Sequence, residues 1–190
     1  MIQVEQETPM ARTSEFLNND CLWRPLEAWP EEQRPALWMW LQDAGSLTNK
    51  LRATAGPAFH VQVLHEGRTL LDAEDARLLH TDTGSAALVR RVYLCADTPW
   101  VYAHTLALTK SGQWLDRLGA HPLGDRVFAH AAAQRSVIEV AQLDPQHELY
   151  QAALEGLKTT PPMLWARRSV LLVDSHRLLI YECFLPGMNT

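Results

Sequence analysis

The sequence predicts an α+β domain with a single, mostly antiparallel sheet of about six strands and helices packed on one face. Two observations lead to this prediction. Apolar residues alternate with a period of two in several segments, which is typical of strands. Neighbouring segments are joined by short polar links rather than by the long crossovers that parallel strands require, so hairpins are expected.

The strand predictions follow this alternation. The predicted strands are 58–65, 87–95, 100–109, 136–142, 164–173 and 177–185. The links at 96–99 and 174–176 contain Asp with Pro or Ser, which favours a hairpin at each. Glu66-Gly67 predicts a turn after the first strand, with a return strand starting at Arg68.

Helices are predicted where the apolar spacing changes to three and four. The first begins at Glu31, has Pro35 in its first turn and ends at Gly45; Ser46 then caps a second one. Further helices are expected at 111–118, 122–128 and 144–154, and residues 73–84 form a loop or a short helix.

Length and composition predict one globular domain. The chain has 190 residues, of which 47% are hydrophobic and 21% charged. Residues 1–30 read as a polar lead-in and residues 31–190 as the domain. The net charge of −5 and the lack of a basic run argue against a nucleic-acid partner.

Targeting and assembly signals are few. No apolar stretch approaches the ~20 residues of a membrane span, and the N-terminus lacks a signal-peptide core, so we expect a cytoplasmic protein. Cys21, Cys95 and Cys183 form no CxxC motif and are expected to be inert thiols. No long exposed apolar stripe is predicted, which favours a monomer.

Common catalytic signatures are missing from the sequence. It contains no GxSxG, P-loop, GxGxxG or HExxH motif. The eight histidines are scattered without the i,i+4 spacing of helical metal ligands, so neither a metal site nor a cofactor is expected.

Charged residues inside predicted strands are the remaining signal. Arg90 and Arg91 are adjacent in a strand, so they point to opposite faces, one toward solvent and one toward the interior. A buried guanidinium needs an anionic partner. Glu182 lies in the apolar last strand and either pairs with one of these arginines or leaves a gap that a polar ligand fills. The alternation alone does not decide which arginine is buried.

Two further polar positions have simpler interpretations. Arg167 and Arg168 are also adjacent, and we expect one of them to be solvated and the other to lie at the sheet edge. His104 is interpreted as a strand histidine with satisfied hydrogen bonds rather than as a catalytic base.

Several strings, in this order, resemble the chorismate pyruvate-lyase family. The resemblance covers roughly residues 36–186. The matching strings are LQDAGSLTNKL (41–51), LVRRVYLCAD (88–97), LDRLGAHPLGDRVF (115–128), LWARRS (164–169) and LLIYECFLP (178–186).

The resemblance implies a chorismate lyase-like fold and a site. Arg90 is implied to bind the ring carboxylate of chorismate and Glu182 the ring hydroxyl, and these two are the implied catalytic residues. Leu123 and Leu47 are implied to add apolar and main-chain contacts. The cation for the second, enolpyruvyl carboxylate is expected to be Arg168 or Arg167.

The implied activity is the elimination of pyruvate from chorismate to give 4-hydroxybenzoate, the first committed step of ubiquinone synthesis. Residues 143–163 read as an insertion relative to the family, and His104-Thr105 stand where the family often has glycine and arginine. A diverged lyase that makes another hydroxybenzoate therefore stays open. A second alternative is a non-catalytic effector-binding module of the same fold, although only about thirty residues precede the first predicted helix, too few for an added DNA-binding domain.

Overall fold

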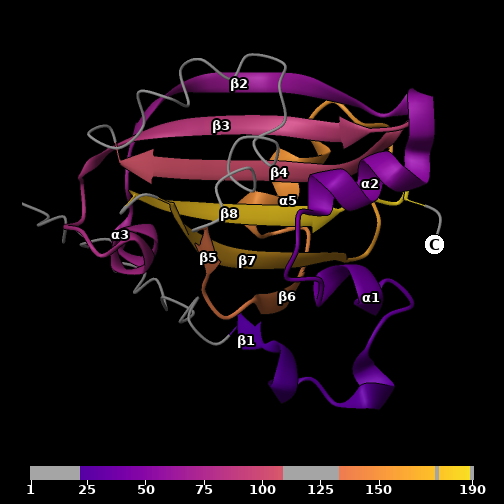
Figure 1. Ribbon diagram of the computed structural model, residues 1–190, viewed down its shortest axis with the longest axis horizontal. Helices are drawn as coiled ribbons and strands as arrows, with labels where there is room; N and C mark the ends of the chain where they lie inside the picture. Colours follow the sequence, from indigo (N-terminus) through magenta and orange to yellow (C-terminus); the bar gives the residue numbers. More distant parts are fainter. Residues whose placement is uncertain (1–21, 109–132, 174–175, 189–190) are drawn as a thin grey trace, which may run out of the picture.

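The computed structural model describes residues 22–108, 133–173 and 176–188, and these ranges form one antiparallel sheet (Figure 1). The order is β1-β6-β7-β8-β4-β3-β2, and β5 also pairs with β7, which makes eight strands rather than about six. The strands are β1 Arg24–Pro25, β2 His60–Leu70, β3 Ala86–Cys95, β4 Pro99–Leu108, β5 Gln134–Arg135, β6 Glu139–Leu143, β7 Leu164–Val173 and β8 His176–Phe184.

The two predicted hairpins are confirmed. Strands β3 and β4 pair antiparallel around the link after Cys95, and β7 pairs antiparallel with β8, with Val173 opposite His176. The central β4–β8 pairing joins the two hairpins into one sheet.

The predicted turn at Glu66-Gly67 is wrong. Strand β2 runs through this dipeptide without reversing, with one irregularity between Val63 and His65. Glu-Gly favours a turn locally, but β2 pairs with β3 on both sides of it, and Gly67 lies opposite Val89. The His65 ring also lies over Gly67, 2.8 Å from where a Cβ would stand. Pairing along the whole strand therefore overrides the local turn preference.

Four α-helices lie in the described ranges. They are α1 Trp38–Leu41, α2 Leu47–Ala55, α3 Ala73–Leu79 and α5 Glu148–Leu154, with short 3₁₀ turns at Leu26–Ala28, Glu31–Gln33 and Gly56–Ala58. The predicted helices at 111–118 and 122–128 lie outside the described residues.

The prediction of one helix from Glu31 to Gly45 is wrong, because the chain forms a 3₁₀ turn and then the separate helix α1. Arg34 is extended, with ψ at 131°, as expected for a residue that precedes a proline. The second helix is confirmed: Ser46 Oγ accepts a hydrogen bond from the backbone N–H of Asn49 at 3.3 Å.

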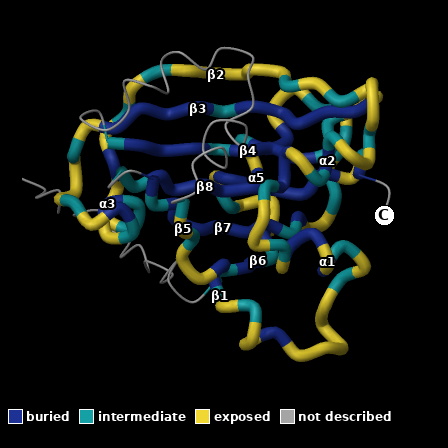
Figure 2. The backbone as a smooth tube through the Cα atoms, viewed as in Figure 1, coloured by how far each residue is buried: buried dark blue, intermediate teal, exposed yellow. Residues whose placement is uncertain are grey.

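Helices cover both faces of the sheet rather than one, which corrects that part of the prediction. Val92 packs in a cluster with Leu47 and Leu51 of α2, whereas its neighbour Tyr93 packs in a second cluster with α3 and α5. In Figure 1, α2 lies in front of the sheet and α5 behind it. Strands β3, β4, β7 and β8 are accordingly buried along most of their length, while the edge strand β2 is largely exposed (Figure 2).

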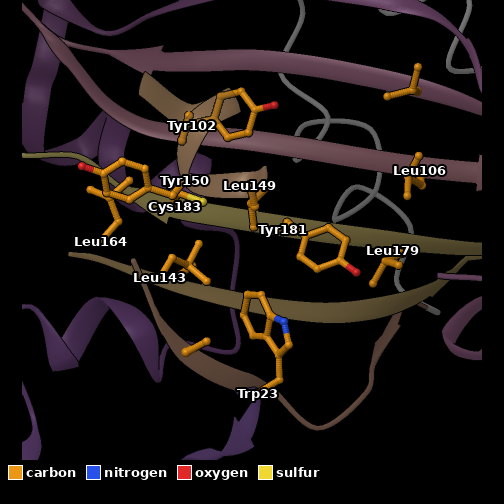
Figure 3. Packing of buried hydrophobic residues seen from close by; sticks show 14 of the residues in the cluster. Trp23, Tyr102, Leu106, Leu143, Leu149, Tyr150, Leu164, Leu179, Tyr181 and Cys183 are labelled. Atoms are coloured by element: carbon orange, nitrogen blue, oxygen red, sulfur yellow. The ribbon is translucent and has the colours of Figure 1, made fainter. Parts of the chain in front are cut away.

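Aromatic side chains anchor the cluster beneath α3 and α5, part of which is drawn in Figure 3. The Tyr93 hydroxyl donates to the carbonyls of Ala153 and Glu155, each at 3.1 Å, and so ties the end of α5 to the sheet. The rings of Trp23 and Tyr181 lie 5.6 Å apart between their centroids. Cys95 and Cys183 are free and buried, and burial raises the pKa of both thiols, as expected for inert residues; Cys21 lies outside the described residues.

Among the described residues, no helix is long and apolar enough to span a membrane.

Candidate active site

A band of buried polar side chains crosses the sheet on the face that α1 and α2 cover. Strand register places Arg90 opposite Thr105, Thr105 opposite Ile180, and Glu182 opposite Arg167. We call this set the polar band; its members are Arg90, Thr105, Arg167, Ser169 and Glu182, and all are buried. Apolar clusters lie on both sides of the band, one with α1 and α2 and one around Leu178. Two sequence-predicted residues, Arg90 and Glu182, thus lie on the same face.

Glu182 pairs with Arg167 and not with Arg90 or Arg91. Nε of Arg167 donates to Oε2 of Glu182 at 2.6 Å. Nη1 of Arg167 donates to the carbonyls of Trp40 and Asp43 at 2.8 and 2.7 Å, at the C-terminal end of α1. These bonds hold Glu182 and α1 in fixed positions relative to the sheet.

One donor of Arg167 is left over. Nη2 is buried and has no hydrogen-bond partner within the described ranges. Buried donors are paired in the great majority of cases, and exceptions call for an explanation such as a bound group. A ligand oxygen in the polar band would supply that partner.

Arg90 is the buried arginine of its pair, with 4% of its surface exposed. Its Nε donates to Oε1 of Glu66 on the edge strand β2 at 2.7 Å. The Glu66 side chain is 38% exposed, so this carboxylate can turn toward solvent when another anion approaches Arg90. The choice of Arg90 over Arg91, which the resemblance implied, therefore agrees with the burial of the two side chains.

Arg135 is a cation of this face that the sequence reasoning missed. Its Nη1 donates to Ser169 Oγ at 2.5 Å, and its Nε donates to the carbonyl of Ala44 at 3.1 Å. Burial lowers the pKa of Arg135, while the nearby carboxylate of Glu182 opposes this shift. It belongs to the two-residue strand β5, which is too short to show an alternating pattern. The only available signal was its position just before a predicted strand.

Leu47 is the first residue of α2 and is 2% exposed. It packs with Leu41, Leu51 and Val92 in the apolar cluster beside the polar band. The structure thus places this predicted contact residue next to the site. Leu123, the other predicted apolar contact, lies outside the described residues.

Arg168 lies on the opposite face from the polar band. It donates to Glu139 at 2.8 Å and to Glu74 at 2.5 Å, and its guanidinium lies 4.7 Å from the ring centroid of Trp23. The expectation that Arg167 or Arg168 is solvated is wrong, since their side chains are 1% and 3% exposed. The reason is that helices cover both faces, so neither direction leads to water.

His104 also lies on the opposite face, paired in register with Arg91 and Tyr181. Its Nε2 is buried and has no partner among the described residues, so the expectation of a satisfied strand histidine is wrong. Burial and the neighbouring Arg91 lower the pKa of His104 to about 4. The ring is therefore neutral at neutral pH and lies away from the polar band.

The polar band suits an anion. Three guanidinium groups, Arg90, Arg135 and Arg167, share this face with two carboxylates, Glu66 and Glu182. Arginine binds carboxylates through parallel hydrogen bonds, and burial strengthens such contacts. In the part of the chain that the structure describes, no three His, Cys, Asp or Glu side chains are grouped to hold a metal ion.

Comparison with protein families identifies the family of this chain. The family model for chorismate lyase matches residues 17–190, which is most of the chain. The chain belongs to the chorismate lyase family. The family named on sequence resemblance is therefore confirmed.

Two curated members of the chorismate lyase family illustrate the similarity. Both are named "Probable chorismate pyruvate-lyase". The protein from Azoarcus sp. is 35% identical over 175 residues, with 85% of this chain and 92% of the relative covered. The protein from Pseudomonas aeruginosa is 38% identical over 159 residues, with 81% of this chain and 85% of the relative covered.

Solved structures show the same fold at low sequence identity. The effector domain of PhnF from Mycobacterium smegmatis has a TM-score of 0.54 at 15% identity, covering 77% of this chain and 91% of that chain. A GntR-family transcriptional regulator from Bacillus cereus has a TM-score of 0.54 at 12% identity. The match covers 70% of this chain and 95% of that chain. The predicted fold class, an α+β domain with one mostly antiparallel sheet, is thus confirmed.

Proposed function

We propose that the protein is a chorismate pyruvate-lyase, which eliminates pyruvate from chorismate to give 4-hydroxybenzoate at the first committed step of ubiquinone synthesis. Membership of the chorismate lyase family carries this proposal. The polar band supports it, because chorismate is a small ring with two carboxylates and the band has more guanidinium groups than carboxylates.

The ring of chorismate is held between Arg90 and Glu182 in this proposal. Arg90 binds the ring carboxylate and releases the partly exposed Glu66. Glu182 accepts a hydrogen bond from the ring hydroxyl, since Arg167 donates to Oε2 and Oε1 has lone pairs to spare. Because Arg167 fixes Glu182, the hydroxyl would meet an acceptor that is already oriented.

The enolpyruvyl carboxylate is bound by Arg167 in the same proposal, through the buried Nη2 that lacks a partner within the described ranges. Arg135 is a further cation on this face, although it already donates to Ser169 and to the carbonyls of Ala44 and Gly45. Arg168, the other predicted candidate, lies on the opposite face and is paired with two carboxylates, so we do not assign it this role.

The reaction balances within the substrate. The ether bond between the ring and the enolpyruvyl oxygen breaks, and the hydrogen on the hydroxyl-bearing ring carbon moves to the enolpyruvyl methylene through a six-membered arrangement. The ring becomes aromatic 4-hydroxybenzoate, and the released group is pyruvate with its methyl completed. The residues' task is to hold the ether in the reactive geometry, and such positioning contributes up to ~7–11 kcal/mol in the best cases.

The test is to mix the purified protein with chorismate and measure 4-hydroxybenzoate by absorbance and pyruvate by a coupled assay. Both products are expected in equal amounts. Arg90→Ala and Glu182→Gln should each reduce kcat/KM by orders of magnitude, whereas Arg68→Ala, an exposed arginine of β2, should not.

Other outcomes would change the assignment. Binding of 4-hydroxybenzoate without turnover of chorismate would replace the lyase by the effector-binding alternative, and a different hydroxybenzoate would indicate a diverged lyase. Full activity of both Arg90→Ala and Glu182→Gln would refute the proposed site while leaving the activity in place.

A further inference from the structure

A cavity lies on the face of the sheet opposite the polar band, beneath α3 and α5. Its volume is about 610 Å³, within the range of small-molecule sites. Arg91, His104 and Tyr181 line it from the strands, Asp75 lines it from α3, and His147 lines it next to α5. Arg90 and Arg91 are adjacent in β3, so the sheet itself separates this cavity from the polar band.

Three nitrogen atoms at this cavity are buried without a hydrogen-bond partner in the described part of the chain. They are Nε of Arg91, Nε2 of His104 and Nε2 of His147. Each belongs to a side chain that lines the same cavity, although the three come from β3, β4 and the start of α5. Unpaired buried atoms are rare, so their convergence on one cavity is the feature expected of a site that binds a polar ligand group.

Three of the four acids that line the cavity are already engaged, and no ion pair joins the fourth, Glu148 of α5, to Arg91 among the described residues. Glu74 pairs with Arg168, and Asp75 accepts a 2.5 Å hydrogen bond from the Tyr181 hydroxyl. Asp72 caps α3 by accepting from the backbone N–H of Asp75 at 2.8 Å. Arg91 makes no ion pair within the described ranges. A guanidinium in this position favours a carboxylate as its partner.

The remaining walls define the body of the ligand. Tyr181 forms an aromatic wall with its ring centroid 5.6 Å from that of Trp23 and 6.0 Å from that of His104. Leu106 and Leu149 add apolar surface, and Figure 3 shows both leucines near Tyr181 in this cluster. A flat apolar group would pack against these side chains.

We propose that this cavity is a second ligand site, which binds a small monocarboxylic acid with a flat apolar body and places the carboxylate on Arg91. His104 and His147 lie beside that carboxylate and supply the further hydrogen bonds. Four acids line the cavity, Asp72 at the N-cap of α3, Glu74 and Asp75 in α3, and Glu148 in α5. They disfavour a phosphate or a dicarboxylate, because additional negative charge would lie near them. The site is independent of the proposed lyase reaction, which uses the other face.

The probe for this site is 4-fluorobenzoate, followed by fluorine NMR and by the ring ¹⁵N signals of the histidines. The protein used is the full chain carrying Arg90→Ala, which removes the proposed active-site arginine. We expect one equivalent of the probe to bind and to shift the ring signals of His104 and His147. Adding Arg91→Met should weaken binding at least tenfold, whereas adding the control Arg68→Met should not.

Several results would overturn the proposal. One is absence of binding to folded Arg90→Ala protein at millimolar probe, and another is binding that Arg91→Met leaves unchanged. Displacement of the probe by equimolar inorganic phosphate would refute the monocarboxylate class. If Arg91→Met does not fold, Arg91→Lys keeps the charge but loses the planar donor pair, and it should still weaken binding severalfold. Failure here leaves chorismate turnover by the wild-type protein untouched, so the two proposals are separable.

Discussion

Arg167 and Glu182 lie directly opposite each other on β7 and β8, and a 2.6 Å hydrogen bond joins Nε of Arg167 to Oε2 of Glu182 in the buried middle of the sheet. Both side chains are at most 10% exposed. A pair buried this deeply stabilises little relative to an apolar pair, but it penalises strongly the loss of one partner.

A double-mutant cycle tests this pair. Arg167→Met leaves the Glu182 carboxylate buried without its partner, and we expect it to lower the free energy of unfolding by about 3–5 kcal/mol. Glu182→Gln alone should cost less, because the amide oxygen can still accept from Nε. The double variant should be more stable than the sum of the two losses predicts, by at least about 1 kcal/mol. Urea unfolding at neutral pH measures all four proteins, and additive losses would contradict the coupling.

The pH dependence of stability should change when Asp75 is replaced. Burial, with Asp72 and Glu74 nearby, raises the pKa of Asp75 to about 6 from the 3.8 of an exposed aspartate. Between these values the folded state binds more protons than the unfolded state, so this group lowers the free energy of unfolding as pH rises from about 4 to 6.

We therefore expect Asp75→Asn to be more stable than the wild type at pH 8, by on the order of 1–3 kcal/mol, and equal to it near pH 4. The amide oxygen still accepts from the Tyr181 hydroxyl, so the contact itself is kept. Thermal or urea unfolding across this pH range measures the difference. A constant difference at every pH would show that titration of Asp75 has no part in it.

His104 should have the opposite effect on stability. Its pKa is lowered to about 4 from 6.5, first by burial and then by Arg91 and His65. Between pH 6.5 and 4 the unfolded state binds more protons, so the free energy of unfolding falls as pH decreases through this window. Replacing His104 by Gln should remove on the order of 3 kcal/mol of this acid-induced loss, as measured by urea unfolding at pH 7 and pH 4.5. His60→Gln, at an exposed position of β2, is the matched control and should leave the pH profile unchanged.

The strands were the most predictable part of the fold. The segments that became β3, β4, β7 and β8 are mostly apolar runs of strand length, and their links are short, so both hairpins followed from local sequence. The same hairpin register could have given the Arg167–Glu182 pair, since Val173 opposite His176 places these residues across from each other. Pairing Glu182 with Arg90 or Arg91 instead overlooked that register.

The contacts of the site were not predictable in the same way. Arg90 meets Glu66 because β2 continues past a dipeptide that locally favours a turn. Arg135 reaches Ser169 and the Ala44 carbonyl across about 34 and 91 positions of sequence, respectively, so only tertiary packing brings them together. The cytoplasmic location, the monomeric state and the insertion at 143–163 stay predictions.

Substitutions of the two adjacent arginines of β7 should have different effects, one on activity and the other on stability. Arg167 lies in the polar band with a spare buried donor, whereas Arg168 lies on the other face between Glu74 and Glu139. Lysine keeps the charge at either position but loses the planar set of donors. If the lyase proposal holds, Arg167→Lys should lower kcat/KM for chorismate by about 10- to 100-fold, the size expected for a lost charged hydrogen bond.

Arg168→Lys should lower the free energy of unfolding by about 1–3 kcal/mol while kcat/KM stays within about twofold of the wild type. Steady-state kinetics with chorismate at a temperature well below both unfolding transitions measure the two effects separately. Equal losses of kcat/KM in the two variants would mean that activity depends equally on arginines on opposite faces of the sheet. The assignment of the enolpyruvyl carboxylate to Arg167 would then be wrong.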